Sequence, residues 1–88
     1  MTRTPPNDSE TVALSALAAT LTDERRATRF LSITGLSPDG IRNALGDRRT
    51  LAACLAFLES HEPDLLAVAE AIGEKPETLI AARAELES

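Results

Sequence analysis

Residues 29–42 have the sequence RFLSITGLSPDGIR, which places a helix end, a tight turn and a helix start in succession. Gly35 supplies the left-handed backbone conformation that commonly follows the last turn of a helix. Ser37 is a favoured helix N-cap, and Pro38 suits the first helical turn, where no N–H donor is needed. The stretch therefore predicts two short helices that meet at a corner.

A second corner of the same chemistry follows at residues 73–79, GEKPETL, which share the pattern G-x-x-P-x-x-[IL] with residues 35–41. Both segments resemble a helix-turn-helix. The shared residue types are those that any such corner requires, so convergent turn chemistry explains the match better than duplication. Two copies are also too few for a solenoid.

On either side of these corners the apolar residues recur with helical spacing, and no stretch shows the alternation of a strand. The spacing predicts helices over residues 8–21 and 23–34, from Pro38 to Gly46, from the N-cap Asp47 onward, over 62–72, and from Pro76 onward. Residues 1–7 are expected to form a disordered tail, and residues 8–88 a single helical domain. The predicted fold class is all-α: a compact bundle of five to six short helices with two helix-turn-helix-like corners.

The apolar residues of each helix define the expected core. In the first helix the inward stripe is Leu14, Leu17, Ala18 and Leu21. The later helices contribute Ala27, Phe30, Leu31, Thr34, Ile41, Ala44, Leu45, Leu51, Cys54, Leu55, Leu58, Leu65, Val68, Ala69, Ile72, Leu79, Ala82 and Leu86. Thr22 is expected to cap the second helix, although a bent continuous helix stays open as an alternative. We expect the stem of Arg83 to cover the core while its guanidinium reaches water, rather than pairing with a buried carboxylate.

Composition excludes several classes of protein. The 88 residues are 43% hydrophobic and 26% charged, which is ordinary for one globular domain. The first ten residues lack the apolar core of a signal peptide, and the apolar run from Leu51 to Leu58 is far shorter than the roughly 18 residues of a membrane span. The single Cys54 excludes an internal disulfide, and with the single His61 it excludes a zinc site of the usual kind. We therefore expect a cytoplasmic protein with no membrane contact.

The charge is unevenly distributed along the chain. Residues 1–49 carry seven arginines against six carboxylates, whereas residues 50–88 carry eight carboxylates against Lys75 and Arg83. The candidate partner surface, able to bind carboxylate or phosphate groups, comprises Arg25, Arg29, Arg42, Arg48 and Arg49. Neighbouring acids such as Asp23 and Asp47 could neutralise these arginines within the domain, which leaves a solvated face as the alternative.

Nucleic-acid binding through the third helix is the competing function. Arg42 and Asn43, with Arg48 and Arg49 just beyond, provide groups for phosphates and base edges. Leu31, however, occupies the position where two DNA-reading helices cross and a small residue is preferred. The net charge of −5 at pH 7 also opposes binding to a polyanion. A nucleic-acid partner is therefore the less favoured interpretation.

The sequence shows no catalytic or cofactor-binding constellation. Cys54 lies on the inward stripe of its helix, where a buried thiol is inert. His61 is expected in the last turn of the fourth helix, in a structural role. The chain has no glycine-rich phosphate loop. The sequence therefore predicts neither an enzyme nor a bound cofactor or metal.

Two longer segments resemble DUF3572, a family of short alphaproteobacterial proteins defined as a domain of unknown function. They are RFLSITGLSPDGIRNAL and LAACLAFLESHEPDLLAVAEAIGEKPETLIAARAEL, and the resemblance covers about residues 10–87. Its most specific parts are the FL-x-x-TGL-x-P corner, FLESHEPDLLA and the closing G-x-x-P-E-x-L-x-x-AR. These residues shape turns and core, so the resemblance supports the fold and implies no established activity. Genes of this family often lie beside one for a single-domain response regulator, which implies a regulatory protein as partner.

We therefore expect a small cytoplasmic helical protein that acts as a non-catalytic protein-interaction or regulatory module. Its partner is expected to be another protein, bound through the arginine surface. Self-association through surplus apolar surface, such as Leu36 or Leu66, is a second option. Nucleic-acid binding through Arg42, Asn43, Arg48 and Arg49 is the alternative function.

Overall fold

The structure, a computed structural model, describes residues 8–43 and 46–88. These residues form the helices α1 (Asp8–Thr22), α2 (Glu24–Thr34), α3 (Pro38–Asn43), α4 (Arg48–Glu59), α5 (Glu62–Ile72) and α6 (Pro76–Glu87). Within the described ranges there is no strand, and the predicted all-α fold is confirmed. The predictions for the tail, residues 1–7, and for Ala44 and Leu45 concern positions outside the described residues.

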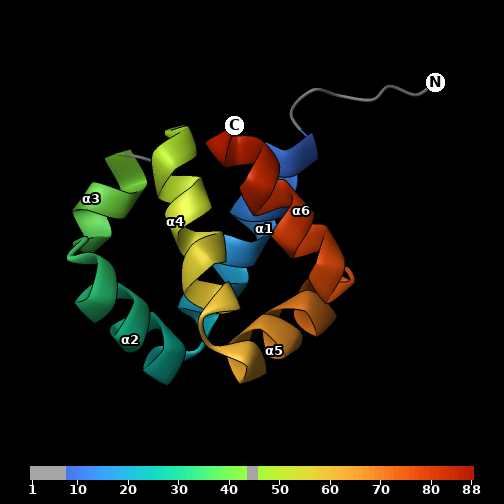
Figure 1. Ribbon diagram of the computed structural model, residues 1–88. Helices are drawn as coiled ribbons and strands as arrows, with labels where there is room; N and C mark the ends of the chain where they lie inside the picture. Colours follow the sequence, from blue (N-terminus) through green and yellow to red (C-terminus); the bar gives the residue numbers. More distant parts are fainter. Residues whose placement is uncertain (1–7, 44–45) are drawn as a thin grey trace.

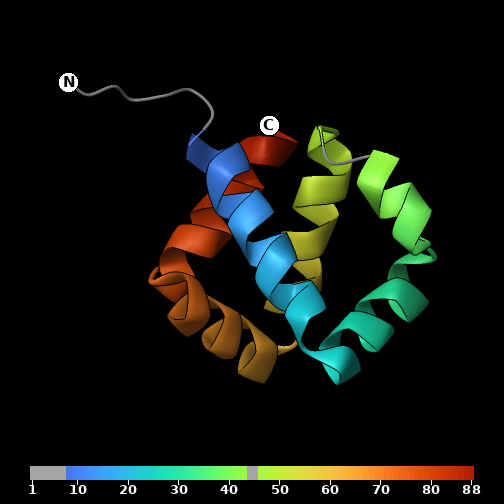
Figure 2. The same cartoon turned by 180° about the vertical axis from the view of Figure 1, so that it is seen from behind.

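Three helices form the centre of the bundle. α1, α4 and α6 pack against one another, while α2 and α3 lie to one side of them and α5 crosses the lower end (Figure 1). Seen from behind, α1 runs diagonally across the front, with α2 and α3 on its right (Figure 2). This arrangement gives α1 one side against α4 and α6 and another side toward α2 and α3.

Both corners have the geometry that the sequence predicts. Gly35 follows α2 with φ of 74°, and its N–H donates to the carbonyl of Leu31 at 2.9 Å. Gly73 follows α5 with φ of 73°. Pro38 and Pro76 are the first residues of α3 and α6. Local turn chemistry therefore sets where four of the helices begin or end.

The chain breaks between α1 and α2, but the capping residue differs from the prediction. Asp23, not Thr22, is the N-cap of α2, and its carboxylate accepts the N–H of Arg26 at 3.1 Å. Thr22 ends α1, where its hydroxyl donates to the carbonyl of Ala19 at 2.8 Å. Because the Thr22 hydroxyl is used inside α1, the neighbouring carboxylate caps the next helix.

The core lies between α1, α4, α5 and α6, with Phe30 from α2 and Ile41 from α3. The predicted stripes of α4 and α6 are buried in full, and that of α5 is buried except for the partly covered Ile72. In α2 only Phe30 of the predicted inward residues is fully buried. Phe30 meets Phe57 edge to face, with ring centroids 5.3 Å apart, which is a favourable aromatic geometry.

α1 buries a different face from the one that was predicted. Of its expected stripe only Leu17 is buried, whereas Leu14 is 40% and Leu21 is 37% exposed, and Ala18 is exposed as well. The buried face consists of Ala13, Ala16, Leu17 and Thr20. Small side chains let α4 and α6 approach closely, and the Thr20 hydroxyl is satisfied by the carbonyl of Ala16 at 2.8 Å. The prediction was wrong because it followed leucine spacing alone.

Two further positions differ from their predictions. The guanidinium of Arg83 does not simply reach water, because it pairs with Glu59 of α4 and with Glu87 at 2.6 Å. The hydrogen bond from Arg83 to Glu59 raises the pKa of Arg83 above its usual value. His61 lies beyond the end of α4, at the N-cap position of α5, where its ring stacks on Phe57 at a centroid distance of 5.7 Å.

Candidate functional site

The five arginines of the predicted partner surface lie on three helices, α2, α3 and α4. Arg25 lies in the first turn of α2 and Arg29 in its middle, where Arg29 pairs with Asp64 of α5. Arg48 lies at the opposite end of the bundle, at the start of α4, which Figure 1 shows beside the end of α6. The structure thus divides the predicted surface into separate basic positions.

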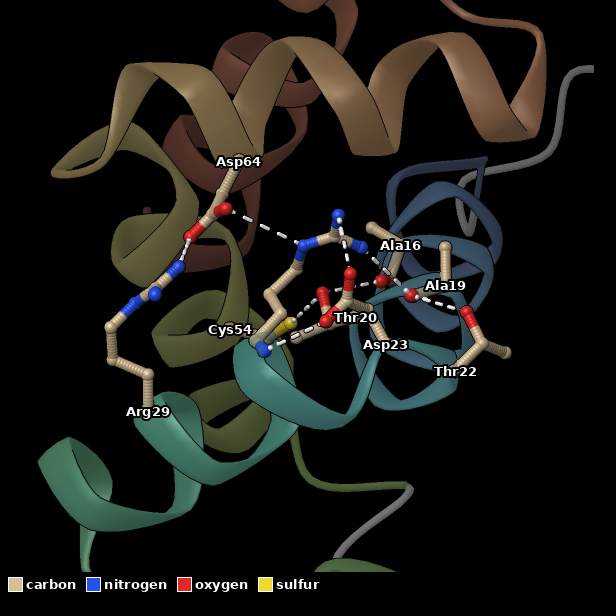
Figure 3. A network of polar contacts seen from close by, with 9 residues as sticks. Ala16, Ala19, Thr20, Thr22, Asp23, Arg29, Cys54 and Asp64 are labelled. Carbon is tan, nitrogen blue, oxygen red and sulfur yellow. Dashed lines mark hydrogen bonds and ion pairs between the residues drawn. The ribbon is translucent and has the colours of Figure 1, made fainter.

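One carboxylate, Asp64, holds two arginines of α2 (Figure 3). Arg29 donates to one of its oxygens, and Nε of Arg26 lies 3.5 Å from the other. Arg26 also donates to the carbonyl of Ala19 at 3.3 Å, near the end of α1. The side chains of Arg26 and Asp64 are only 15% and 14% exposed. This cluster joins three helix ends, so its first role is to fix how α1, α2 and α5 meet.

The carboxylate of Asp23 completes this cluster at its exposed edge. Its pKa is lowered chiefly because it accepts the backbone N–H of Arg26, and the positive charge of Arg26 acts in the same direction. The distance from Asp23 to the Arg26 guanidinium is 3.6 Å. Asp23 is therefore ionised at neutral pH, as a helix N-cap requires.

The remaining candidate arginines differ in the contacts that their side chains make with other helices. Arg48 lies 3.6 Å from Glu10 and donates to the carbonyl of Glu85 at 3.1 Å, so it ties α4 to the start of α1 and the end of α6. Within the described ranges, Arg42 forms its ion pair with Asp39 of its own helix, at 3.4 Å. Among the residues that the structure describes, the side chains of Arg25 and Arg49 form no ion pair.

The residues predicted to contact nucleic acid also differ in whether they already have partners within the protein. Arg42 and Arg48 each face a carboxylate, and Arg48 is also committed to a helix end. The side chain of Asn43 lies outside the described part of the chain. Of the four residues proposed to contact nucleic acid, Arg49 is therefore the one with a described side chain that forms no ion pair within the described residues.

Cys54 and His61 are placed against other side chains rather than at a reactive surface. Burial raises the pKa of the Cys54 thiol to about 12, and its Sγ lies 3.8 Å from the hydroxyl of Thr20. A thiol with this pKa is not a nucleophile at neutral pH. Nowhere in residues 8–43 and 46–88 do three or more His, Cys, Asp or Glu side chains gather closely enough to hold a metal ion.

The most distinctive surface feature is an apolar groove between α1, α2 and α3, which we call the leucine groove. Its lining residues are Leu14, Leu17, Ala18, Leu21, Leu31, Pro38, Ile41 and Arg42, and its volume is about 520 Å³. Figure 2 shows the three helices that supply these residues. Leu17 and Ile41 are buried, while Leu14 and Leu21 remain partly exposed on the α1 side. Arg42 is the charged member of the lining.

Sequence reasoning missed this groove because it assigned Leu14, Ala18 and Leu21 to the core. One signal was nevertheless available. No Asp, Glu, Lys or Arg occurs from Thr11 to Thr22, although this stretch makes more than three helical turns. The exposed residues in this stretch are Thr11, Leu14, Ser15, Ala18, Leu21 and Thr22. An exposed helix face without charge is typical of the centre of a protein interface, where charged residues are depleted.

In residues 8–43 and 46–88, the other exposed large apolar side chains are Ile33, Leu66 and Ile80, on α2, α5 and α6. None of them lines the leucine groove. Leu36, which the sequence suggested for self-association, is partly buried and packs against the core. Scattered exposed residues of this kind are normal on a protein surface, and only a concentrated apolar patch indicates contact with a partner.

Comparison with known proteins gives a family but no activity. No curated protein and no solved structure matches the chain. Of the helices described, none has the length and apolar character needed to cross a membrane. The family described as "Protein of unknown function (DUF3572)" matches residues 6–88, and the chain belongs to this family.

Proposed function

We propose that the protein is a non-catalytic protein-interaction module of the cytoplasm and that the leucine groove is its contact surface. The observation that carries the proposal is the grouping of Leu14 and Leu21, 40% and 37% exposed, along one wall of an apolar groove. Covering such a surface contributes about 25 cal/mol for each Å² of apolar area removed from water. A partner that fills the groove therefore gains binding energy without a change in the fold.

Arg42 connects this proposal with the predicted arginine surface. It lines the groove, and 74% of its side chain is exposed. Its contact with Asp39 is a pairing of two exposed groups on one short helix, which contributes little stability. Arg42 is thus available to a carboxylate at the edge of a bound partner, in the manner of the polar rim around an apolar interface.

The absence of catalysis is part of the same proposal. It is supported by the burial of Cys54, which suppresses thiolate formation, and by the stacking of His61 on Phe57. The Nδ1 atom of His61 is itself buried. A buried thiol lacks the access to substrate that nucleophilic catalysis requires, and a buried Nδ1 leaves one ring nitrogen of His61 out of reach for acid–base catalysis. The cytoplasmic location is supported by the free thiol of Cys54, which is compatible with a reducing compartment.

Affinity capture with matched variants tests the proposal. Leu21→Glu places a charge in the groove, whereas Ile80→Glu places one on α6 at a position of nearly equal exposure, 37% against 39%. From lysate of the producing cell, the wild-type protein and Ile80→Glu should capture the same proteins, and Leu21→Glu should lose them. Circular dichroism verifies that both variants are folded. Equal capture by both variants would rule out the groove as the contact surface.

A further inference from the structure

The exposed face of α1 has a pattern that is complementary to itself. Ala18 lies four residues after Leu14 and three before Leu21, so a small residue sits between two large ones on the helix surface. When two such helices cross antiparallel at Ala18, Leu14 of each helix approaches Leu21 of the other. The small residue at the crossing point lets the backbones come close. A two-fold dimer requires a patch that is self-complementary in this way.

The charge distribution points to the same face. Each chain carries a net charge of −5 at pH 7, so two copies repel each other unless their contact avoids the carboxylates. The exposed residues of α5 and α6 include Glu70, Glu77 and Glu85. The exposed face of α1 from Thr11 to Thr22 has no charge, and the charged group that lines the groove is the cationic Arg42. A second acidic chain therefore meets no like charge in the leucine groove.

The groove has two walls from different helices, and each wall has a role in the dimer. α1 forms one wall, and α2 and α3 form the other with Leu31, Pro38 and Ile41. In an antiparallel crossing, the exposed ridge of α1 from each copy enters the groove of the other. Leu14 and Leu21 of each copy then insert into the groove of the partner copy and also line the groove that receives the partner's α1.

We propose that the leucine groove is occupied by a second copy of the chain, in a two-fold dimer whose α1 helices cross antiparallel at Ala18. This inference rests on the proposed function, because it takes the groove as a protein contact surface and names the occupant. A strictly monomeric chain would overturn the dimer, whereas capture of partner proteins that does not depend on the groove would overturn the proposed function.

A disulfide across the two-fold axis tests the crossing point. Packed helices have axes about 8–10 Å apart, and each Cα lies about 2.3 Å from its axis. Two Ala18 Cα atoms that face each other are then about 3.4–5.4 Å apart, a range that overlaps the roughly 4.4–6.8 Å between the Cα atoms of a disulfide. Cys54 does not compete, because its thiol is buried and its pKa is raised to about 12.

The variants are Ala18→Cys and, as a control, Ala67→Cys, which is exposed in the middle of α5. Both are oxidised in a glutathione redox buffer, and covalent dimer is followed by non-reducing electrophoresis. Ala18→Cys should cross-link at least about tenfold faster, because dimerisation raises the effective concentration of its thiol. Equal rates for the two variants would overturn the proposed crossing.

Sedimentation equilibrium tests the dimer without a new cysteine. The wild-type protein and Ile80→Glu should dimerise, and Leu21→Glu should sediment as a monomer. A wild-type chain that stays strictly monomeric would overturn the second copy as occupant. If Leu21→Glu still lost its captured proteins in that case, the proposed function would stand and a different protein would be the occupant. If neither cross-linking nor capture depended on α1, both proposals would fail.

Discussion

Asp64 shows how one side chain can decide the geometry of three helices. It lies in the first turn of α5, where the helix N-terminus favours a carboxylate, and it faces two arginines of α2. Asp64→Asn keeps the shape but leaves Arg29 without a countercharge and Arg26 with Asp23 as its only described countercharge. We expect a loss of about 1–2 kcal/mol in the free energy of unfolding, less than for a fully buried pair because Arg29 is partly solvated.

Urea denaturation measures this loss. Glu70→Gln is the matched control, since Glu70 is exposed on α5 and, within the described residues, has no ion pair. Its free energy of unfolding should change by less than about 0.5 kcal/mol. If Asp64→Asn were as stable as Glu70→Gln, the cluster would contribute nothing to the packing of α5.

Cys54 gives a second prediction at the level of one residue. Burial raises the pKa of its thiol to about 12, so the native protein should not react with a thiol reagent at pH 8, whereas the urea-unfolded protein should react fully. The sign for stability follows from linkage. The pKa of the Cys54 thiol is higher in the folded protein than in the unfolded chain. The stability that the protonated thiol contributes is therefore fully present below the unfolded pKa, and it is lost as pH rises toward 12.

Thiol titration and denaturation at pH 8 and pH 10 check these outcomes, with Cys54→Ala as the reference. The wild-type protein should lose more stability than Cys54→Ala between the two pH values. Rapid native reaction at pH 8 would contradict the burial of this residue.

At the scale of the helix corner, Gly35 makes the clearest prediction. Its φ of 74° lies in the left-handed region, where a side chain is strained even though open space surrounds the position. Gly35→Ala should therefore cost about 1 kcal/mol of stability. Gly46→Ala is the control, because Gly46 has equally open space and its φ lies outside the left-handed region.

Thermal unfolding of the two variants provides the measurement. Gly46→Ala should be within about 0.5 kcal/mol of the wild-type protein, or slightly more stable, because alanine restricts the unfolded chain. Equal destabilisation by both substitutions would show that the left-handed turn is not what the α2–α3 corner needs.

The helices themselves show what a sequence can and cannot predict. The corners at Gly35 and Gly73 were predictable because each depends on a few adjacent residues. The buried face of α1 was not, because this helix is apolar around much of its surface, and Ala13 and Ala16 decide which side α4 and α6 can approach. The partner of Arg83 was equally hidden, since Glu59 lies 24 residues away in the chain.

The candidate site escaped prediction for the same reason. The leucine groove combines side chains from three helices, so no single stretch of sequence contains it. Two arginines of the predicted partner surface, Arg29 and Arg48, pair with carboxylates on other helices, Asp64 and Glu10. Spacing along one helix reveals which residues share a face, but not which neighbouring helix will cover that face.

The charge of the whole molecule adds a prediction about the dimer. With a net charge of −5 on each chain, long-range repulsion opposes association, and salt screens this repulsion. Raising the salt concentration from about 50 mM to about 500 mM should therefore tighten the dimer, and apolar contact also strengthens under such conditions. Nucleic-acid binding would have the opposite dependence, since phosphate contacts weaken steeply with salt.

Sedimentation at the two salt concentrations tests this prediction, and a titration against duplex DNA at the same concentrations serves as the comparison. A dimer that dissociates as salt increases would indicate that ion pairs hold it together rather than the apolar face of α1.

The contact of Ser9 with Glu85, at 3.3 Å, and the bridge that Arg48 makes between Glu10 and Glu85 place the first turn of α1 beside the last turn of α6. A short glycine–serine linker can therefore join these two helix ends, and the ring so formed can be opened at the exposed Gly46, before α4. Such a circularly permuted chain would begin with α4 and end with α3, and it would keep every helix contact described above.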